Sequence, residues 1–201
     1  MAAKKLKFFS VLSGSDEDYR PFYDNFLFHL GKVGLKEEHE LVKLDMKAGL
    51  WQSDDFIKVT MAKLDYTRKF LKEGFTVFLS DLDIVFLKNP LPYFSSLLKE
   101  KDIAFQFSSK GIPSTYNPFP PNKNVNTGFY IAKPTALNID LFDTREQIEI
   151  IGGDHSDQGY IQAKIQRIKK YQELRQGILP PPLFPNGHYW FNNHGDLDPY
   201  I

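Results

Sequence analysis

The sequence predicts a doubly wound α/β domain in which helices cover both faces of a mostly parallel central sheet. Short apolar runs alternate with amphipathic stretches from the start of the chain, in the order β-α-β-α-β. The third run, residues 75–80, is apolar almost throughout, as expected of a strand buried on both faces. The chain has 201 residues, 42% of them hydrophobic, which is enough for one substantial core. We therefore expect residues 1–201 to form a single domain.

The first half of the chain supplies this β-α-β-α-β unit. Residues 6–12 predict a strand that runs into the turn Ser13-Gly14-Ser15, and a helix begins near Asp16. The next elements are a strand over residues 40–44, a helix from residue 53 to about residue 72, and the strand over residues 75–80. This order is typical of the mononucleotide-binding half of doubly wound proteins.

One charged residue lies in the apolar stripe of the second helix. The stripe has the spacing expected of a buried helix face, and Lys63 lies between its apolar members, Phe56, Val59, Tyr66 and Phe70. Lys63 either lies at the edge of the stripe with its ammonium group in solvent, or directs a cation into the crevice at the carboxyl ends of the strands.

The second half of the chain is less regular. We expect a short helix over residues 89–98, a strand over 102–107, a long loop over 108–123, a strand over 129–132, and helices over 134–150 and 159–175. Residues 179–182 are expected to be extended, and residues 184–201 to form a surface tail rich in aromatic, Asn and His residues.

Composition excludes several classes of function. Lys and Arg together number 25, as do Asp and Glu, and this balance argues against a nucleic-acid-binding protein. The chain has no cysteine, which excludes disulfides and thiolate chemistry. Residues 6–12 are too short an apolar run for a signal peptide or a membrane span. We expect a soluble cytoplasmic protein without membrane insertion, and we allow for further domains after residue 201.

Two aspartates at the end of the third strand are the strongest functional signal. If the strand continues, Asp81 and Asp83 share a face and Leu82 points away. Two neighbouring carboxylates repel each other unless a cation lies between them, and Mg²⁺ or Mn²⁺ prefers oxygen ligands of this kind. The alternative is that both aspartates cap a turn before Asn89-Pro90. Because the pair interrupts an apolar segment, a metal and phosphate site is the favoured interpretation.

The same aspartates fit a second kind of enzyme. Asp81-Leu82-Asp83-Ile84-Val85 matches the haloacid-dehalogenase pattern, in which Asp81 would be the nucleophile of a phosphatase. In that family the nucleophile normally follows the first strand, whereas here a complete β-α-β-α unit precedes it. The later acidic motif, Gly153-Asp154 with Asp157, is also shorter than that family's spacing.

Several motifs in order resemble those of another family. These are residues 78–90, Asn126-Thr127-Gly128-Phe129, Asp157-Gln158 before a helix, Leu179-Pro180-Pro181, and Phe184-Pro185-Asn186-Gly187. The chain resembles the nucleotide-diphospho-sugar transferases of the GT-A fold that use an Asp-x-Asp motif. Within that family it is similar to the branch of the plant cell-wall xylosyltransferases and to glycosyltransferases encoded by large chlorella viruses. The resemblance implies one GT-A domain with a Rossmann-like sheet.

The resemblance also implies roles for residues around the aspartates. Asp83 would bind Mn²⁺ or Mg²⁺, and Asp81 would hold the metal together with the ribose or sugar of the donor, which by analogy is a UDP-sugar. Leu82 belongs to the same donor-binding motif. Lys63 would add positive charge near the diphosphate or donor sugar. The metal would stabilise the departing nucleoside diphosphate.

The remaining donor contacts come from three other segments. Ser13 and Gly14, with Tyr19 nearby, would receive the uracil and ribose. Asn126 and Gly128 would line the donor sugar, although Asn126-Thr127-Gly128 also reads as a plain turn.

Asp157 and Gln158 would lie beside the anomeric carbon, although Asp157 also fits a helix N-cap. No carboxylate base for an inverting reaction stands out. Asp157-Gln158 resembles the corresponding residues of retaining members, so the resemblance favours retention of configuration during transfer to a glycan hydroxyl.

One feature departs from the family pattern. A late histidine followed by asparagines normally supplies a third metal ligand, and the candidates here are His188 and His194. His194 follows two asparagines instead of preceding them, so the true ligand can also lie beyond residue 201. A non-catalytic nucleotide-sugar-binding module is the remaining alternative. Such a module would tolerate loss of Asp81 and Asp83, whereas both aspartates are present in this sequence.

Overall fold

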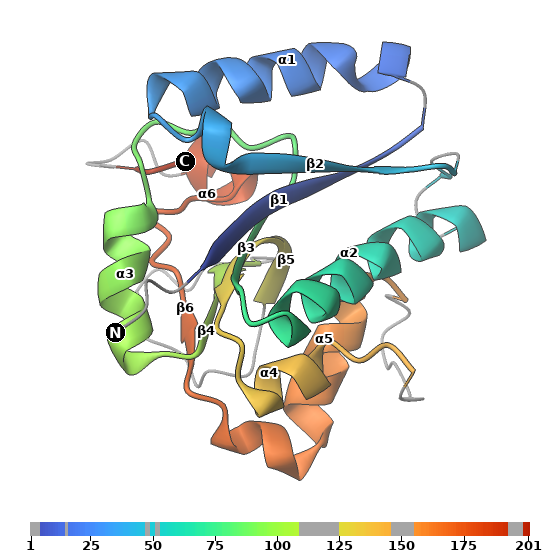
Figure 1. The fold of residues 1–201 in the computed structure, drawn as a ribbon, viewed down its shortest axis with the longest axis vertical. Helices are drawn as coiled ribbons and strands as arrows, with labels where there is room; N and C mark the ends of the chain where they lie inside the picture. Colours follow the sequence, from blue (N-terminus) through green and yellow to red (C-terminus); the bar gives the residue numbers. More distant parts are fainter. Residues whose placement is uncertain are drawn as a thin grey trace.

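A mixed but mostly parallel sheet forms the centre of the protein (Figure 1). The computed structural model describes residues 5–14, 16–46, 49–50, 53–108, 125–145, 155–192 and 199–201. Within these residues six strands pair in the order β2-β1-β3-β5-β4-β6. They are β1 (Leu6–Ser13), β2 (His39–Leu44), β3 (Thr76–Ser80), β4 (Ile103–Phe107), β5 (Val125–Ala132) and β6 (Gln176–Ile178). β5 is antiparallel to both β3 and β4, and the other pairs are parallel, which confirms the predicted fold class.

Helices cover both faces of this sheet (Figure 1). One face packs against α1 (Asp16–Lys32) and α3 (Leu91–Glu100), and the other packs against α2 (Asp54–Lys72), α4 (Ala136–Leu141) and α5 (Asp157–Arg167). Alternation along the strands divides the apolar side chains between the two faces: Phe78 joins the α1 side, whereas Val77 and Leu79 join the α2 side. Every residue of β3 is buried, as its apolar sequence predicts.

A chain of hydrogen bonds links the first three strands of the sheet. The Ser10 hydroxyl donates to the Ser80 carbonyl over 2.6 Å. Since a hydroxyl has a single proton, His39 Nε2 must be the donor in its 2.9 Å contact with Ser10 Oγ. The imidazole ring meets the rings of Phe8 and Phe26 edge-on. Burial lowers the pKa of His39 to about 4, against the smaller opposing effect of Glu40.

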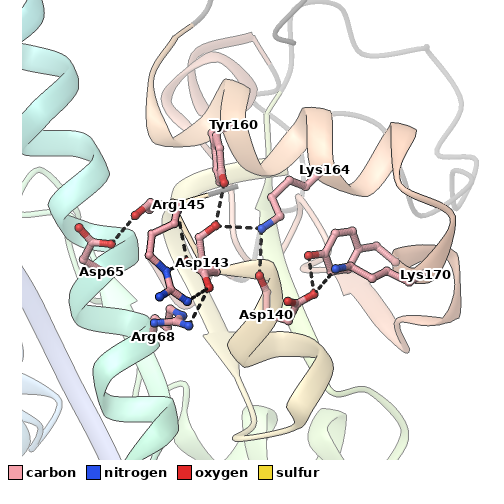
Figure 2. A network of polar contacts seen from close by, with 10 residues as sticks. Asp65, Arg68, Asp140, Asp143, Arg145, Tyr160, Lys164 and Lys170 are labelled. Carbon is pink, nitrogen blue, oxygen red and sulfur yellow. Dashed lines mark hydrogen bonds and ion pairs between the residues drawn. The ribbon is translucent and has the colours of Figure 1, made fainter. Parts of the chain in front are cut away.

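A polar network fixes α5 against α4 and α2 (Figure 2). The fully buried Lys164 donates to the carbonyls of Asp140 and Asp143 at 2.9 and 3.0 Å, and thereby satisfies the C-terminal end of α4. Asp143 also accepts hydrogen bonds from Arg68 of α2 and from Arg145. The hydrogen bonds from Arg145 are the main reason that the pKa of Asp143 lies well below its usual range. The body of α5 is therefore held firmly, which positions the residues at its N-terminus.

Element boundaries in the second half of the chain differ from the prediction. α4 ends at Leu141, where Phe142 N and Asp143 N donate to the Asn138 and Asp140 carbonyls, and residues 146–150 lie outside the described residues. α5 ends at Arg167, and the 3₁₀ helix η2 (Lys169–Glu173) follows it where one helix was predicted. β6 was not predicted. β5 begins at Val125 instead of residue 129, because residues 125 and 126 pair with β4. Of the predicted loop 108–123, Ser108 alone is described.

The predicted surface tail is wrong at both ends of the segment, whereas Gly187, Trp190 and Phe191 between them are exposed. Phe184 is fully buried and stacks on Phe94 and on Tyr200, with ring centroids 5.7 and 5.2 Å apart. The backbone of Tyr200 accepts from Leu87 N and donates to the Leu183 carbonyl, so residues 199–201 are part of the folded domain. A short helix, α6 (Gly187–Asn192), occurs within the same segment. Among the described residues, none of the helices has the length and apolar character needed to cross a bilayer.

Candidate active site

A cavity of about 660 Å³ opens where β3, β4 and β5 meet the C-terminal segment. Its volume lies in the range typical of small-molecule sites. One part of the wall is acidic and polar, and another part is apolar. The lining residues are Asp81, Asp83, Ile84, Val85, Leu87, Gln106, Asn126, Gly128, Pro185, Asn186, Gly187, Trp190, Phe191 and Ile201.

Asp81 and Asp83 both line the cavity, but the reason differs from the one predicted. β3 ends at Ser80, and residues 82 and 83 form a turn, so strand alternation does not place the two aspartates. The amide of Asp81 donates to the Gly128 carbonyl over 2.7 Å, which carries the pairing with β5 one residue beyond the strand. The turn then brings Asp83 to the same cavity, while the side chain of Leu82 packs against the core on the α1 side.

A polar face of α2 organises the carboxylates from behind. Lys63 Nζ lies 3.2 Å from Asp81 Oδ1 and 3.1 Å from Asp157 Oδ2. One turn earlier, Thr60 Oγ1 accepts a 3.3 Å hydrogen bond from the Asp157 amide. One turn later, the Thr67 hydroxyl contacts the Tyr130 hydroxyl at 2.6 Å. The buried face of α2 is therefore polar at Thr60, Lys63 and Thr67, so Lys63 is not a lysine at the edge of an apolar stripe.

The charges of this group are unbalanced. Asp81, Asp83 and Asp157 carry three carboxylates, and Lys63 supplies one ammonium. Burial would lower the pKa of Lys63, but the charges of Asp157 and Asp81 outweigh this effect and raise it. Desolvation raises the pKa of Asp81 to about 6, with Lys63 opposing the rise and Asp157 and Asp83 adding to it. The site therefore has an excess of negative charge that a cation can neutralise.

Gly128 leaves room for the carboxylate of Asp81. A Cβ at position 128 would lie 2.6 Å from Asp81 Oδ2 and 3.1 Å from Asn126 Oδ1. The space that a side chain would fill is thus taken by the aspartate, and the glycine allows this close approach.

An amide chain fixes the neighbouring side chains. Gly128 N donates to Asn126 Oδ1 at 2.8 Å, so the other amide atom of Asn126 must be the nitrogen, which donates to Gln106 Oε1 at 2.9 Å. Gln106 Nε2 in turn donates to the Pro185 carbonyl at 3.1 Å. This chain connects β5, β4 and the C-terminal segment along the cavity wall.

The structure brings together only some of the predicted site residues. Gln158 lies next to Asp157 at the start of α5, where its amide contacts Ser108 Oγ at 3.3 Å. Ser13 and Gly14 end β1, where Gly14 N donates to the Met46 carbonyl, and they do not line the cavity. Tyr19 lies in the first turns of α1, also away from the cavity lining. His194 lies outside the described residues.

Several residues of the cavity were not predicted from the sequence. Gln106 was not singled out, although an amide at the carboxyl end of a predicted strand is the kind of signal that locates a crevice in an α/β sheet. Trp190 and Phe191 were assigned to a surface tail, yet both line the cavity. Thr60 was missed because a threonine inside a helix carries little signal of its own.

The donor set suits a hard divalent cation that a phosphate helps to bind. Within the described part of the chain, no group of three or more His, Cys, Asp or Glu side chains is arranged to hold a metal. Mg²⁺ and Mn²⁺, however, are often bound by one or two carboxylates, with substrate phosphates and water completing the coordination. Asp81 and Asp83 meet that requirement, because both line the cavity and the side chain of Asp81 is 37% exposed.

Comparison with known proteins identifies the family. The family model for nucleotide-diphospho-sugar transferases matches residues 28–201. The chain belongs to this family. As a family member it is a glycosyltransferase, which favours the transferase interpretation of the two aspartates over the phosphatase one. No curated protein matches the sequence.

Solved structures of glycosyltransferases resemble this transferase at low sequence identity. A glycosyltransferase involved in the glycosylation of the major capsid of PBCV-1 is 9% identical, with a TM-score of 0.49 over 88% of this chain and 83% of its own. GlyE of Streptococcus pneumoniae TIGR4 is 11% identical, with a TM-score of 0.44 over 90% of this chain and 46% of its own. TarS of S. aureus is 12% identical, with a TM-score of 0.44 over 87% of this chain and 35% of its own. The chain thus spans less than half the length of the two bacterial proteins.

Proposed function

We propose that this transferase moves a sugar from a UDP-sugar to a glycan hydroxyl, with Mn²⁺ or Mg²⁺ as cofactor and with retention of configuration. The observation that supports the proposal is the cluster of carboxylate side chains at the cavity. Asp81 and Asp83 line the cavity, and Lys63 joins Asp81 to Asp157 behind it. Such a group suits a donor that carries both a diphosphate and a sugar. An origin in a large chlorella virus stays a prediction.

Asp81 and Asp83 would hold the metal. When bound, the cation acts as a Lewis acid that neutralises the charge of the leaving diphosphate. The excess of negative charge around Asp81 supports this role, because a divalent cation would balance it. Lys63 was expected to face the diphosphate, and its ammonium is paired with two carboxylates. We infer that Lys63 contributes by holding Asp81 and Asp157 in place for the donor.

The donor would lie across the carboxyl ends of β1 and β3 and the amino-terminal half of the antiparallel strand β5. Ser13 and Gly14 at the end of β1, with Tyr19, would receive the nucleoside. Asn126 and Gly128 of β5 would contact the sugar. β3 lies between β1 and β5 in the sheet, and a donor bound in this way would have its diphosphate near Asp81 and Asp83, which follow β3.

Retention is supported by the carboxylates that the cavity offers. Among the described residues that line it, Asp81 and Asp83 are the carboxylates, and both are assigned to the metal. Asp157 is buried, is paired with Lys63 and does not line the cavity, so it is poorly placed to deprotonate an acceptor. The contact of Asp157 with sugar hydroxyls stays a prediction from the resemblance. Gln158 follows it at the start of α5 and would lie near the anomeric carbon.

Thermal shift and UDP release test the proposal together. UDP should raise the melting temperature only when Mn²⁺ or Mg²⁺ is present, and at least one member of a panel of UDP-sugars should release UDP. Asp83→Asn keeps the size of the side chain and removes its charge, so we expect loss of the metal-dependent shift and of UDP release. Asp24→Asn, an exposed aspartate of α1, is the matched control and should behave like the wild type. Metal-dependent UDP binding that survives in Asp83→Asn would refute the assignment.

A further inference from the structure

The cavity has an apolar side that the proposed donor site does not use. Trp190 is 44% exposed and Phe191 is 73% exposed, and both line the cavity from α6. Leu87, which is 48% exposed, lies in the same lining. Exposure of large apolar groups at a polar cavity costs solvation free energy, and a group of them at one cavity indicates a binding surface.

The position of α6 separates these aromatic residues from the nucleoside side. The Asn186 amide donates to the Phe107 carbonyl at the end of β4, and its oxygen caps α6 by accepting from Tyr189 N. In the sheet order, β4 lies two strands from β3 in the direction away from β1. The aromatic pair is therefore attached on one side of the aspartates, and Ser13 and Gly14 lie on the other.

We propose that Trp190 and Phe191 form the platform on which the sugar ring of the acceptor stacks, an inference that rests on the proposed function. With the nucleoside at β1 and the diphosphate at Asp81 and Asp83, the space toward α6 is left for the group that attacks the donor sugar. A pyranose ring suits it, because one face of the ring presents C–H groups while hydroxyls project from its edge. The negative face of an aromatic ring attracts such C–H groups.

A kinetic experiment separates the acceptor platform from donor binding. UDP release is measured with the best donor of the UDP-sugar panel, while methyl glycosides of glucose, galactose, xylose, mannose and rhamnose are varied as acceptors. Trp190→Ala and Phe191→Ala should each raise the KM for the stimulating glycoside about tenfold, since truncated aromatic anchors commonly cost this much in affinity. The effect should fall on the KM for the acceptor and not on that for the donor. Trp190→Phe, which keeps an aromatic face, should recover much of the loss.

A matched control and a direct binding measurement complete the test. Phe22 of α1 is 57% exposed and does not line the cavity, so Phe22→Ala should leave the acceptor KM unchanged. The chain has two tryptophans, so Trp51→Phe leaves Trp190 as the single fluorescent indole. Its emission should shift when a stimulating glycoside is added.

Two results would overturn the platform. One is an unchanged acceptor KM in both alanine variants. The other is a fluorescence emission maximum of Trp190 that no glycoside of the panel shifts. Absence of UDP release from every UDP-sugar, without any acceptor, would instead refute the proposed function itself.

Discussion

Replacing Gly128 with alanine tests whether the position of the Asp81 carboxylate limits the reaction. The added Cβ would lie 2.6 Å from Asp81 Oδ2, whereas ordinary contact begins near 3.4 Å, so the carboxylate has to move by about 0.8 Å. Functional groups must be held within about 0.5 Å of their working positions, and an error of about 1 Å can cost on the order of 10²-fold in rate. We expect G128A to lower kcat/KM for the UDP-sugar by about 10- to 100-fold, which corresponds to about 1.4–2.8 kcal/mol.

The fold should tolerate this change, which makes the result interpretable. Among the described glycines, those with positive φ are Gly14, Gly34 and Gly74, so the backbone at Gly128 accepts an alanine. Gly177 of β6 is the matched control in the same sheet, because its added Cβ would meet Lys101 Cγ at an ordinary 3.4 Å. UDP release and metal-dependent UDP binding would be compared in G128A and G177A after thermal denaturation has shown that the two variants have the same melting temperature. If the two variants show the same activity, the close approach of Asp81 to Gly128 has no role in the reaction.

Three further predictions concern charge. Lys63→Met leaves the Asp157 carboxylate buried without its cation and should cost about 3 kcal/mol of the free energy of unfolding, measured by urea titration. The control Lys58→Met breaks a surface pair with Asp55 and should cost less than about 1 kcal/mol. Equal losses in the two variants would show that the buried pair of Lys63 and Asp157 does not stabilise the fold more than a surface pair does. Burial lowers the pKa of His39 from 6.5 to about 4, so between these pH values the unfolded chain binds a proton at His39 that the folded protein does not. The free energy of unfolding should therefore fall by about 3 kcal/mol as the pH drops from 6.5 to about 4. His39→Gln should lessen that fall, and an unaltered pH profile would assign it to other groups. Chelation of divalent metal should abolish the shift caused by UDP but leave the melting temperature of the free protein unchanged, whereas unfolding on chelation would indicate a structural metal.

The strands of the first half of the chain could be predicted because the pattern of apolar residues within each strand is enough to indicate it. Residues 75–80 are apolar on both faces of the strand, which suits the centre of a sheet and little else. The start of β5 carries the opposite signal, since Asn126, Thr127 and Gly128 are typical of a turn. They form a strand because Asn126 pairs with β4 and the Gly128 carbonyl accepts from Asp81 N, and the Asn126 amide is held by Gln106. Pairing between distant segments overrides the local preference of these residues for a turn, and no local sequence pattern predicts that pairing.

The site could be predicted in outline for a similar reason. Asp81 and Asp83 stand out because carboxylates interrupt an apolar segment. Lys63 was singled out as a cation on an apolar stripe, but its two partners could not be read from spacing along the chain. Asp157 comes from a distant part of the sequence and reaches Lys63 because α5 packs against α2 and α4, where Thr60 and Lys164 fix it. Trp190 was missed because aromatic residues in an irregular segment predict no particular surface.

The placement of charge would allow the proposed metal site to be stable without a metal and still attract one. Lys63 is fixed on a helix and compensates the buried Asp157 and the neighbouring Asp81 at all times, so the fold does not depend on an added ion to cover them. Asp83 is exposed, and water solvates it in the free protein. The ammonium thus neutralises one carboxylate charge of the three and leaves the rest at the cavity, where a divalent cation can exchange. A second fixed cation beside Asp83 would halve that excess, and would weaken the attraction for a metal that arrives with the diphosphate of the donor.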